Sequence, residues 1–388
     1  MADSVLRIGV LGLSRGFVLM RPAFLADRRC RLVAATDPRA EARLAFEREF
    51  DARAYDTSEA LCLDPEVDVV YIASPHERHA EQAIEAARHG KHVLVEKPMA
   101  LSLGDCRAMQ AAADAAGVRL MVGPSHSYDA PIAWAAELIA SGAHGDLRMI
   151  TAMNFTDFIY RPRRPEELET ARGGGVVFSQ AAHQVDVVRR LAGAPVRSVR
   201  AQAGVWDADR PTQGAYQAFL TFEGGATATL SYSGYGRFDT DALMGWIGET
   251  GASKDPADYG ASRRRLAAGD EEDLKRLRAY GADASPAVPA ALAHEHFGFI
   301  VASCERADLR PTATGVEVFA DDERRTVDLP VSAPRSGVID ELWAAVVDGV
   351  APLHDGAWGA ANLATCLAIL RSSLEGREVT LDEMENPA

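Results

Sequence analysis

One short stretch of the chain places groups that can transfer protons at the end of a strand. Residues 91–98 read Lys-His-Val-Leu-Val-Glu-Lys-Pro. The apolar run 93–95 predicts a buried strand, and Glu96 and Lys97 follow it directly. Pro98 lacks an N–H group and restricts Lys97 to an extended backbone, so the strand ends in a defined direction. A lysine in this place can act as a cation or a proton donor, whereas the structural alternative is a salt-bridged pair at a solvated strand end.

A second set of reactive residues follows three consecutive glycines at 173–175. The pattern of residues 176–191 predicts a helix. Ser179 and His183 lie four residues apart in it, the spacing that puts two side chains on one face of an α-helix. A lone histidine on a helix is usually a packing residue. Because Lys97 and the glycine run accompany it, we interpret His183 as a group that takes part in proton transfer.

Residues 157–165 form an unusual segment, Asp-Phe-Ile-Tyr-Arg-Pro-Arg-Arg-Pro. This composition disfavours a helix, and we expect a loop over the active-site cleft. Arginine binds carboxylates through two parallel hydrogen bonds, as lysine cannot. In a chain of net charge −15, this cluster indicates an anionic small-molecule substrate. The alternatives are local pairing with Glu166, Glu167 and Glu169, or an oligomer contact. The candidate substrate-binding residues are Tyr160, Arg161, Arg163, Arg164, Ser179, Gln180 and His183.

The elements that must position Lys97 alternate between strand and helix. Strands are expected over 6–11, 31–36, 67–73, 93–95 and 118–122, and helices up to residue 27 and over 40–50, 79–89 and 99–117. This alternation predicts an α/β fold with a parallel, doubly wound sheet. Ligands of such sheets bind at the carboxyl ends of the strands. That edge should gather Gly12, Asp37, Ser74, His76, Glu96 and Lys97.

The first strand leads into a turn that resembles a dinucleotide-binding loop. Residues 12–17 read Gly-Leu-Ser-Arg-Gly-Phe, although the strict motif would place glycine at 14 and 17. Asp37 ends the second strand, where an acidic residue binds ribose hydroxyls and repels a 2′-phosphate, which favours NAD over NADP. Arg39 could soften this preference, and Asp37 could instead be a turn residue. The candidate cofactor-binding residues are Gly12, Ser14, Arg15, Gly16, Phe17, Asp37, Ser74, Pro75, His76, His79, Glu96 and Lys97.

Length and composition limit the class of protein. The 388 residues favour two domains, which we place at 1–124 and 125–388. The net charge disfavours nucleic-acid and anionic-membrane partners, and no apolar run approaches the ~20 residues of a membrane helix. The five cysteines are scattered without metal-ligand spacing, and the amino terminus passes directly into a strand. A cytoplasmic protein with reduced cysteines and no bound metal is therefore expected.

The second domain is expected to contain a sheet and peripheral helices. Alternating polarity predicts strands over 147–155, 196–206, 215–222 and 226–232 and a hairpin over 315–319 and 325–329. Helices are expected over 131–141, 336–348 and 358–374, and the closing helices could pack back on the first domain. Residues 254–289 look like an insertion with one helix at 271–280, and part of this insertion is expected to be mobile. His294 and His296 precede a further strand, but the nearby carboxylates lack metal-ligand spacing.

Several motifs together resemble the glucose-fructose oxidoreductase and inositol dehydrogenase (Gfo/Idh/MocA) family. They are Asp37-Pro38, Ser74-Pro-His-Glu-Arg-His79, Gly90-Lys-His-Val93, Glu96-Lys97-Pro98 and Gly173-Gly-Gly175 followed by His183 and Asp186. The resemblance extends over roughly residues 5–373. It implies an N-terminal Rossmann domain and a C-terminal domain with a large open mixed sheet. Because the open face of this sheet is often an interface in the family, a homodimer or homotetramer is implied.

The resemblance also implies roles for individual residues. Lys97 would lie near the nicotinamide and the reacting oxygen, and the Lys97–Pro98 bond is often cis in relatives. His183 would contact the substrate hydroxyl. Sugar and cyclitol dehydrogenases carry an aspartate four residues before this histidine, where the present chain has Ser179.

Two further departures from the family pattern leave the proton relay open. Ala181 replaces a glycine, and His76 stands where relatives often have asparagine. Either His183 works with Lys97 alone, or Gln180, Tyr160 or another histidine shapes the site.

The runs 160–168 and 173–186 resemble the phthalate 4,5-cis-dihydrodiol dehydrogenase branch of the family. This resemblance implies oxidation of a cyclohexadiene cis-diol dicarboxylate to 4,5-dihydroxyphthalate, which aromatisation of the ketone would drive. One alternative is a sugar or cyclitol dehydrogenase, against which the missing aspartate and the arginine segment argue. The other is a non-catalytic NAD-binding regulator, against which the presence of Lys97 and His183 argues.

Overall fold

The structure is a computed structural model that describes residues 5–281 and 291–385. Contacts within it divide the chain into two compact units. Of the described residues, 5–124, 272–281 and 335–363 belong to the first unit and the others to the second. The chain thus leaves the first unit after residue 124 and returns to it twice. We had assigned 272–281 to the second domain; the structure places this segment in the first unit, because Tyr280 packs among aromatic residues there.

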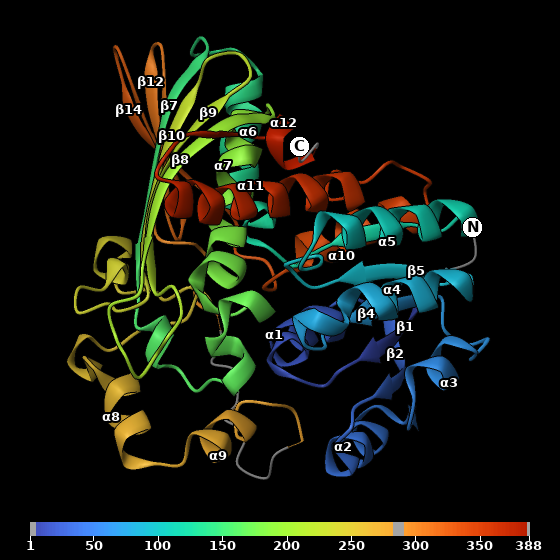
Figure 1. Cartoon of the computed structure of the whole chain (residues 1–388). Coiled ribbons are helices and arrows are strands. Elements are labelled where there is room, and N and C mark those ends of the chain that lie inside the picture. The colour runs from blue at the N-terminus through green and yellow to red at the C-terminus, as the bar shows by residue number, and fades with distance from the viewer. Residues whose placement is uncertain (1–4, 282–290, 386–388) are drawn as a thin grey trace. The chain divides into compact units, whose positions relative to one another are not determined.

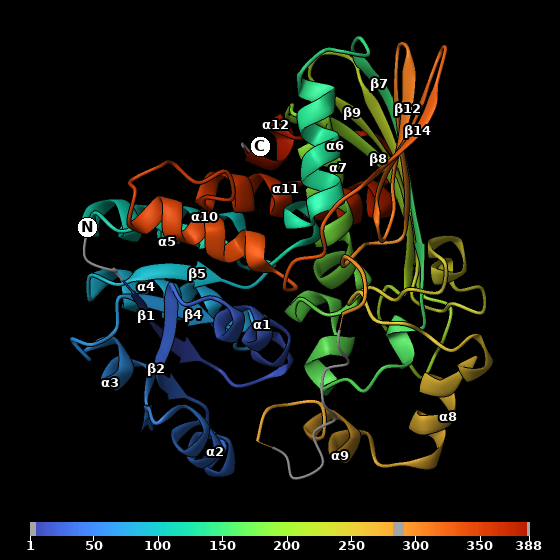
Figure 2. The ribbon, with the colours of Figure 1, turned by 180° about the vertical axis from the view of Figure 1, so that it is seen from behind.

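The first unit contains a six-stranded sheet in the order β3-β2-β1-β4-β5-β6, in which all pairs are parallel. This is the strand order of doubly wound dinucleotide-binding folds. The central strands β1 and β4 are apolar except for Arg7, because helices cover both faces of the sheet, as Figures 1 and 2 show. The strands are β1 (Leu6–Leu11), β2 (Cys30–Thr36), β3 (Arg53–Tyr55), β4 (Val69–Ile72), β5 (His92–Val95) and β6 (Leu120–Val122). The expected parallel, doubly wound sheet is confirmed.

The helices of the first unit follow the sequence pattern closely, with one clear difference. They are α1 (Arg15–Ala26), α2 (Ala40–Phe50), α3 (Ser58–Cys62), α4 (His79–Arg88), α5 (Leu103–Ala116), α9 (Glu271–Arg276) and α10 (Ser336–Val346). Glu271, the first residue of α9, belongs to the second unit, and the rest of this helix belongs to the first. The helix expected from residue 99 begins only at Leu103, because the Ser102 side chain accepts a hydrogen bond from the Asp105 N–H and caps the helix there.

The second unit is built on an open, mixed nine-stranded sheet in the order β14-β13-β12-β11-β7-β10-β9-β8-β15. Only β10 and β7 pair in parallel; the other neighbours are antiparallel. The strands are β7 (Leu147–Phe155), β8 (Val196–Gly204), β9 (Ala215–Phe222), β10 (Thr227–Ser233), β11 (Phe299–Cys304), β12 (Ala307–Pro311), β13 (Gly315–Ala320), β14 (Arg324–Asp328) and β15 (Val379–Thr380). The large open mixed sheet implied by the family resemblance is confirmed.

One face of this sheet forms the core of the second unit. The helices α6 (Ala130–Ala140) and α7 (Ala182–Ala192) stand on that face (Figure 1), as does the part of α11 (Gly356–Glu375) after residue 363; α12 (Asp382–Glu385) follows β15. Ile150, Leu220 and Leu230 of the sheet are buried in one cluster with Val185 and Ile369 of the helices. Residues of the opposite register point to the other face, where Met149, Phe219 and Phe319 are exposed.

Several expectations for the insertion and for the second unit need correction. The insertion contains the additional helix α8 (Ala261–Ala268), which periodicity missed because it has no apolar face and buries only Ala261. The helix expected at 271–280 ends at Arg276, and residues 282–290 lie outside the described part of the chain. The strands β12 and β15 were not expected either.

The segment before α7 is irregular, as its prolines suggested. It forms three 3₁₀ turns over Phe158–Tyr160, Pro165–Leu168 and Thr170–Arg172. The expected helix over 176–191 opens with a π-helical stretch, Val177–Ala181, before α7 begins. The hydroxyl of Ser179 donates to the Gly175 carbonyl oxygen, 2.5 Å away, which is the acceptor that the Ser179 N–H would use in an α-helix. The four-residue spacing of Ser179 and His183 therefore does not follow α-helical geometry.

Candidate functional site

The glycine loop of the first unit is packed against the end of β4. Gly12 has φ +92°, and a Cβ atom there would lie 2.8 Å from the Ser74 Cα atom. Ser14 Oγ donates to the Ala73 carbonyl oxygen at 2.6 Å, so this hydroxyl does not cap α1. A Cβ atom on Gly16 would meet Glu96 Oε1 at 3.0 Å. The loop and the ends of β4 and β5 are therefore brought together, as expected for the carboxyl edge of the sheet.

The carboxylate of Asp37, at the end of β2, is bound by the protein itself. Asp37 Oδ2 accepts the Leu13 N–H at 2.8 Å, and Oδ1 accepts the Arg39 N–H and Nε–H at 2.9 Å each. Arg39 Nη2 lies 3.1 Å from Oδ2 and also donates to the Leu13 carbonyl oxygen. An ionised carboxylate offers about four lone-pair positions, and each has a donor here. A ribose hydroxyl would have to replace one of the Arg39 donors.

Tyr280, which we had not expected at the site, anchors a distant segment beside the glycine loop. Its N–H donates to the Leu13 carbonyl oxygen at 3.1 Å, and its own carbonyl oxygen accepts Arg39 Nη1 at 3.0 Å. Its ring lies edge to face with Phe17, 5.2 Å between centroids, and its hydroxyl donates to Glu49 Oε2 at 2.6 Å. Phe17, an expected cofactor ligand, is completely buried in this aromatic cluster and packs beneath the glycine loop of residues 12–17.

Several expected cofactor ligands at the ends of β4 and β5 instead hold the backbone together. His79 is completely buried, with its ring nitrogens 2.9 Å from the Pro98 carbonyl oxygen and 3.0 Å from that of Ser74. Burial lowers the pKa of His79 and so disfavours the protonated ring, while the hydrogen bonds to the two carbonyl oxygens act in the opposite direction. Glu96 Oε1 accepts the Tyr71 hydroxyl at 2.8 Å. His79 and Glu96 thus position the loop that carries Lys97.

The remaining members of this group lie close by. The Lys97–Pro98 peptide bond is cis, as the family resemblance implied. Lys97, Ser74, Pro75 and His76 are half-buried at this edge. The Ser74 hydroxyl donates to the Gln82 side chain at 2.6 Å, and the His76 and His79 rings meet edge to face at 5.6 Å.

In the second unit, His183 is buried at the start of α7. Its Nδ1 lies 3.1 Å from Ser125 Oγ, and its ring packs edge to face against that of His126 with 4.8 Å between centroids. Phe297 lies beside both rings. His126 and Phe297 were not expected; the only sequence signal was an isolated His-x-x-Asp spacing, 126 to 129, at the junction of the two expected domains.

Near His126, the side chains of Glu249, Arg161 and Asn154 form a group of polar contacts. Glu249 Oε2 lies 3.3 Å from Arg161 Nη1, and Glu249 Oε1 accepts the Asn154 amide. Burial alone would raise the pKa of Glu249, but Arg161 and His126 lower it below its ordinary value. Gln180, an expected substrate ligand, accepts the buried Tyr232 hydroxyl at 3.1 Å.

Most arginines of the expected substrate loop are paired within the protein. Arg161 bonds to Asp157 and Glu249, and Arg164 lies within 4.0 Å of Glu166 and Glu167. Pairing with Glu166 and Glu167, which we had kept as an alternative, is therefore what the structure shows for Arg164, whereas Arg161 pairs with Asp157 and Glu249. The Tyr160 hydroxyl donates to Asp207 at 2.8 Å.

Arg163 differs from its neighbours. Its guanidinium lies 3.5 Å from the centroid of the Phe158 ring, and Nη2 donates to the Phe158 carbonyl oxygen. Glu167 is 3.7 Å from Nη1, beyond hydrogen-bond distance. Nε is buried without a hydrogen-bond partner among the described residues. Burial lowers the pKa of Arg163 to about 10, since Glu167 offsets only part of this cost. Arg163 thus has a buried Nε without a hydrogen bond to the described residues, although its guanidinium still forms a long ion pair with Glu167.

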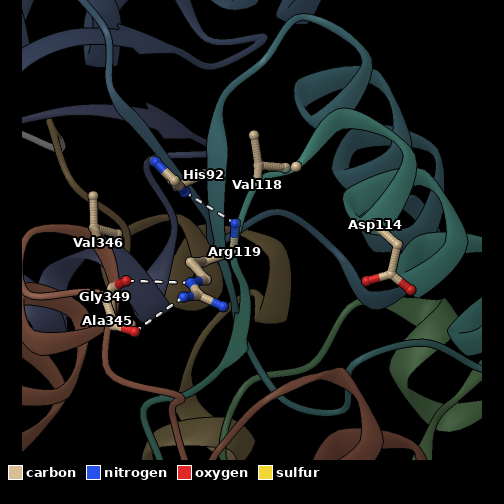
Figure 3. Close-up of a pocket in the computed structure, with 8 residues that line it drawn as sticks. His92, Asp114, Val118, Arg119, Ala345, Val346 and Gly349 are labelled. Atoms are coloured by element: carbon tan, nitrogen blue, oxygen red, sulfur yellow. Dashed lines mark hydrogen bonds between the residues drawn. The ribbon is translucent and has the colours of Figure 1, made fainter.

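One hollow of the first unit lies away from these residues (Figure 3). There Arg119 donates to the Ala345 and Gly349 carbonyl oxygens, and its N–H donates to His92 Nδ1. The residues that line this hollow are His92, Asp114, Gly117, Val118, Arg119, Ala345, Val346 and Gly349. Because His92 and Arg119 lie at the amino ends of β5 and β6, this hollow is on the edge of the sheet opposite to that where ligands bind.

Two further sequence expectations concern metals and membranes. Within residues 5–281 and 291–385, no three histidine, cysteine or acidic side chains are placed to hold a metal ion. No helix among these residues combines the length and apolarity needed to cross a bilayer.

Comparisons with known proteins agree with both sheets. Residues 6–124 match the model of an oxidoreductase family with an NAD-binding Rossmann fold, and residues 132–252 match the GFO/IDH/MocA C-terminal domain. The chain is 46% identical, over 94% of both chains, to 1-carboxy-3-chloro-3,4-dihydroxycyclohexa-1,5-diene dehydrogenase of Comamonas testosteroni. It is 30% identical, over 63% of this chain and 72% of the relative, to the NAD⁺-dependent scyllo-inositol 2-dehydrogenase of Bacillus subtilis. A crystal structure from Bordetella bronchiseptica RB50, of a protein designated a dehydrogenase, superposes with a TM-score of 0.92 at 38% identity, covering 97% of this chain and 100% of that one.

Proposed function

Because the chain belongs to the GFO/IDH/MocA family of oxidoreductases, we propose that it is an NAD-dependent dehydrogenase of a carboxylated cyclohexadiene cis-diol. The proposed substrate is 4,5-dihydro-4,5-dihydroxyphthalate, and the proposed product is 4,5-dihydroxyphthalate. The observation that carries this proposal is Arg163, a buried arginine with unused donor capacity in a chain that is 46% identical to a dehydrogenase of a carboxylated dihydrodiol.

The glycine loop fits a dinucleotide. Gly12 approaches the backbone of Ser74 more closely than any side chain would allow, and Ser14 leaves the amino end of α1 without a side-chain cap. Uncapped N–H groups at a helix amino terminus bind phosphate groups. When bound, NAD supplies the acceptor for a hydride from the carbinol carbon.

The roles of this chain's own residues follow from their chemistry. Lys97 binds the hydroxyl oxygen and takes up its proton, with His183 as the second proton-transfer group. Arg163 binds a carboxylate and orients the ring. The C–H hydrogen leaves as hydride and the O–H hydrogen as a proton, which leaves a hydroxyketone. Its tautomerisation to a catechol makes the oxidation favourable.

We infer NAD rather than NADP from the end of β2. Asp37 carries a negative charge there, and the donors of Arg39 are directed to Asp37, Leu13 and Tyr280 rather than to a phosphate. An additional phosphate would meet a carboxylate and an arginine that is already bound.

The decisive experiment offers purified enzyme and NAD a set of diols and measures NADH formation. The set contains phthalate cis-4,5-dihydrodiol, a monocarboxylated cis-dihydrodiol, an uncarboxylated one and scyllo-inositol. Turnover of the carboxylated diols alone, with loss in Lys97→Ala, is the expected result. Turnover of scyllo-inositol instead would move the protein to the sugar and cyclitol branch. NAD binding without turnover of any of the four would favour a regulator.

We further propose a homodimer or homotetramer through the open face of the nine-stranded sheet. Phe219, Thr229, Thr151 and Val301 pair in one row across four strands, and Met149 lies in the next row. Phe219 and Met149 are large, exposed apolar side chains on this face, and exposed apolar patches mark interaction surfaces. Light scattering should give a multiple of 41.6 kDa for the native chain and a smaller mass for Phe219→Glu; equal masses would contradict this interface.

We also propose that the protein is cytoplasmic. All five cysteines are free thiols, and only Cys304 is not buried, which suits a reducing compartment.

A further inference from the structure

A short turn after the first unit is fixed against α7 at two points. The turn, His126–Tyr128, is bound through the Ser127 N–H, which donates to Asp186 Oδ2 on α7 at 3.2 Å. Just before it, Ser125 Oγ lies 3.1 Å from His183 Nδ1. The turn therefore has a defined position relative to His183, and Asp186 serves this attachment.

The turn brings a second imidazole against the first. The centroids of the His126 and His183 rings lie 4.8 Å apart at an interplanar angle of 66°, and Phe297 packs at 5.1 Å and 5.0 Å from the two rings. Both histidines are buried. Charges on neighbouring rings in such surroundings interact with little screening by water.

Carboxylates surround His126. Its Nδ1 lies 2.7 Å from Asp129 Oδ2, and Glu249 and Glu295 are the other acidic groups that act on it. Burial is the largest effect and disfavours the protonated ring, but the three carboxylates outweigh it and raise the pKa of His126 above its ordinary value. Glu249 in turn is bound by Arg161 and lies near His296.

Ser179 supplies no charge to this arrangement, because serine is neutral, and its hydroxyl donates to the Gly175 carbonyl oxygen. We propose that His126, held as a cation by Asp129, is the positioning partner that keeps His183 neutral and ready to accept a proton. This inference rests on the proposed dehydrogenase function. The cation 4.8 Å away disfavours a second positive charge on His183, while Ser125 fixes the orientation of its ring.

The first test is the pH dependence of kcat/KM for the diol that the enzyme turns over. In Asp129→Asn, His126 loses the charge that keeps it protonated, and His183 no longer faces a cation. The pKa of His183 then rises, and the acidic limb of the profile moves to higher pH by about one unit. His126→Gln should produce the same shift, and the double variant no additional one. An unchanged limb in folded Asp129→Asn would overturn the proposal.

A matched control is available in the first unit. Glu341 Oε2 lies 2.8 Å from Nδ1 of the buried His354, a pair of the same kind that is assigned to no step. Glu341→Gln therefore reproduces the loss of a buried histidine–carboxylate pair, and its pH profile should match that of the native enzyme.

A second measurement does not depend on turnover. NMR titration of histidine labelled with ¹⁵N in its ring follows His183 directly, with His183→Gln to assign its signal among the 10 histidines. The midpoint for His183 should be higher in His126→Gln than in the native protein. Equal midpoints would refute the inference even with an active enzyme, whereas absence of diol oxidation with shifted midpoints would refute only the proposed reaction.

Discussion

Arg39 and Asp37 hold one another at the end of β2, with Arg39 Nε 2.9 Å from Asp37 Oδ1. Arg39 Nη1 is in turn held by the Tyr280 carbonyl oxygen, from a segment more than two hundred residues later in the chain. The residues that we propose to select the adenosine ribose are thus restrained by a part of the chain that no nucleotide-binding motif includes.

This pairing predicts how cofactor choice responds to mutation. Asp37→Asn removes the charge that opposes a 2′-phosphate and releases Arg39, so NAD should bind roughly tenfold more weakly, the value of about one charged hydrogen bond, and NADP more tightly. Arg39→Ala should preserve NAD binding and abolish any binding of NADP. Calorimetric Kd values for both cofactors test this, and an unchanged NAD-to-NADP ratio in Asp37→Asn would contradict it.

Tyr280 should stabilise the first unit mainly through its ring. Tyr280→Ala removes a nearly buried aromatic side chain, and we expect a loss of ~3 kcal/mol in the free energy of unfolding together with weaker NAD binding. Tyr280→Phe keeps the ring and removes only the bond to Glu49, for about 1 kcal/mol. Urea titrations of the two variants measure the difference. Equal losses would show that the hydroxyl, and not the ring, anchors the segment.

Arg163 should contribute to function at a cost to stability. A buried arginine with an unpartnered Nε is unfavourable in the folded protein. Arg163→Met should therefore raise the free energy of unfolding by about 1 kcal/mol while increasing KM for a carboxylated diol ~10-fold or more. Arg164→Met, at a paired and more exposed position, is the control and should change KM little. A loss of stability in Arg163→Met without a change in KM would assign Arg163 a structural role.

His79 should make stability depend on pH. Its folded-state pKa is lowered by burial, so the unfolded chain binds the additional proton first. Stability is then lost as the pH falls below about 6.5, the ordinary pKa of histidine, towards the lower folded value. In His79→Gln, this contribution should disappear from the dependence of the urea midpoint on pH.

The same variant tests the positioning role of His79. His79→Gln should also lower kcat, because the Pro98 carbonyl that follows Lys97 loses a contact. Full activity together with an unchanged pH dependence of stability would exclude the role we assign to this residue.

Local pattern was sufficient for most of the first unit. The strands β1, β2, β4 and β5 are apolar because both of their faces are buried, and such runs are visible without any knowledge of partners. The alternation of strand and helix then implies a parallel sheet and places Gly12, Asp37 and Lys97 at one edge. The start of α5 is also set by a local contact, the cap at Ser102, although we had expected this helix from residue 99.

The chemical state of the side chains at that edge was not a local property. His79, Glu96 and Phe17 have the types and positions of cofactor ligands, yet their partners come from strands and helices elsewhere in the unit. The same holds for the arginines, since only folding decides that Arg161 pairs with Glu249, that Arg164 pairs with Glu167 and that Nε of Arg163 is buried without a hydrogen bond to any described residue.

The amino-acid sequence by itself therefore determined most of the elements, their order and the family, because these depend on periodicity and on motifs of neighbouring residues. Tertiary structure alone decided that Tyr280 reaches Arg39 and that His126 meets His183. Such pairs join residues far apart in the chain, and their burial, which sets both hydrogen bonding and charge, exists only once the chain has folded.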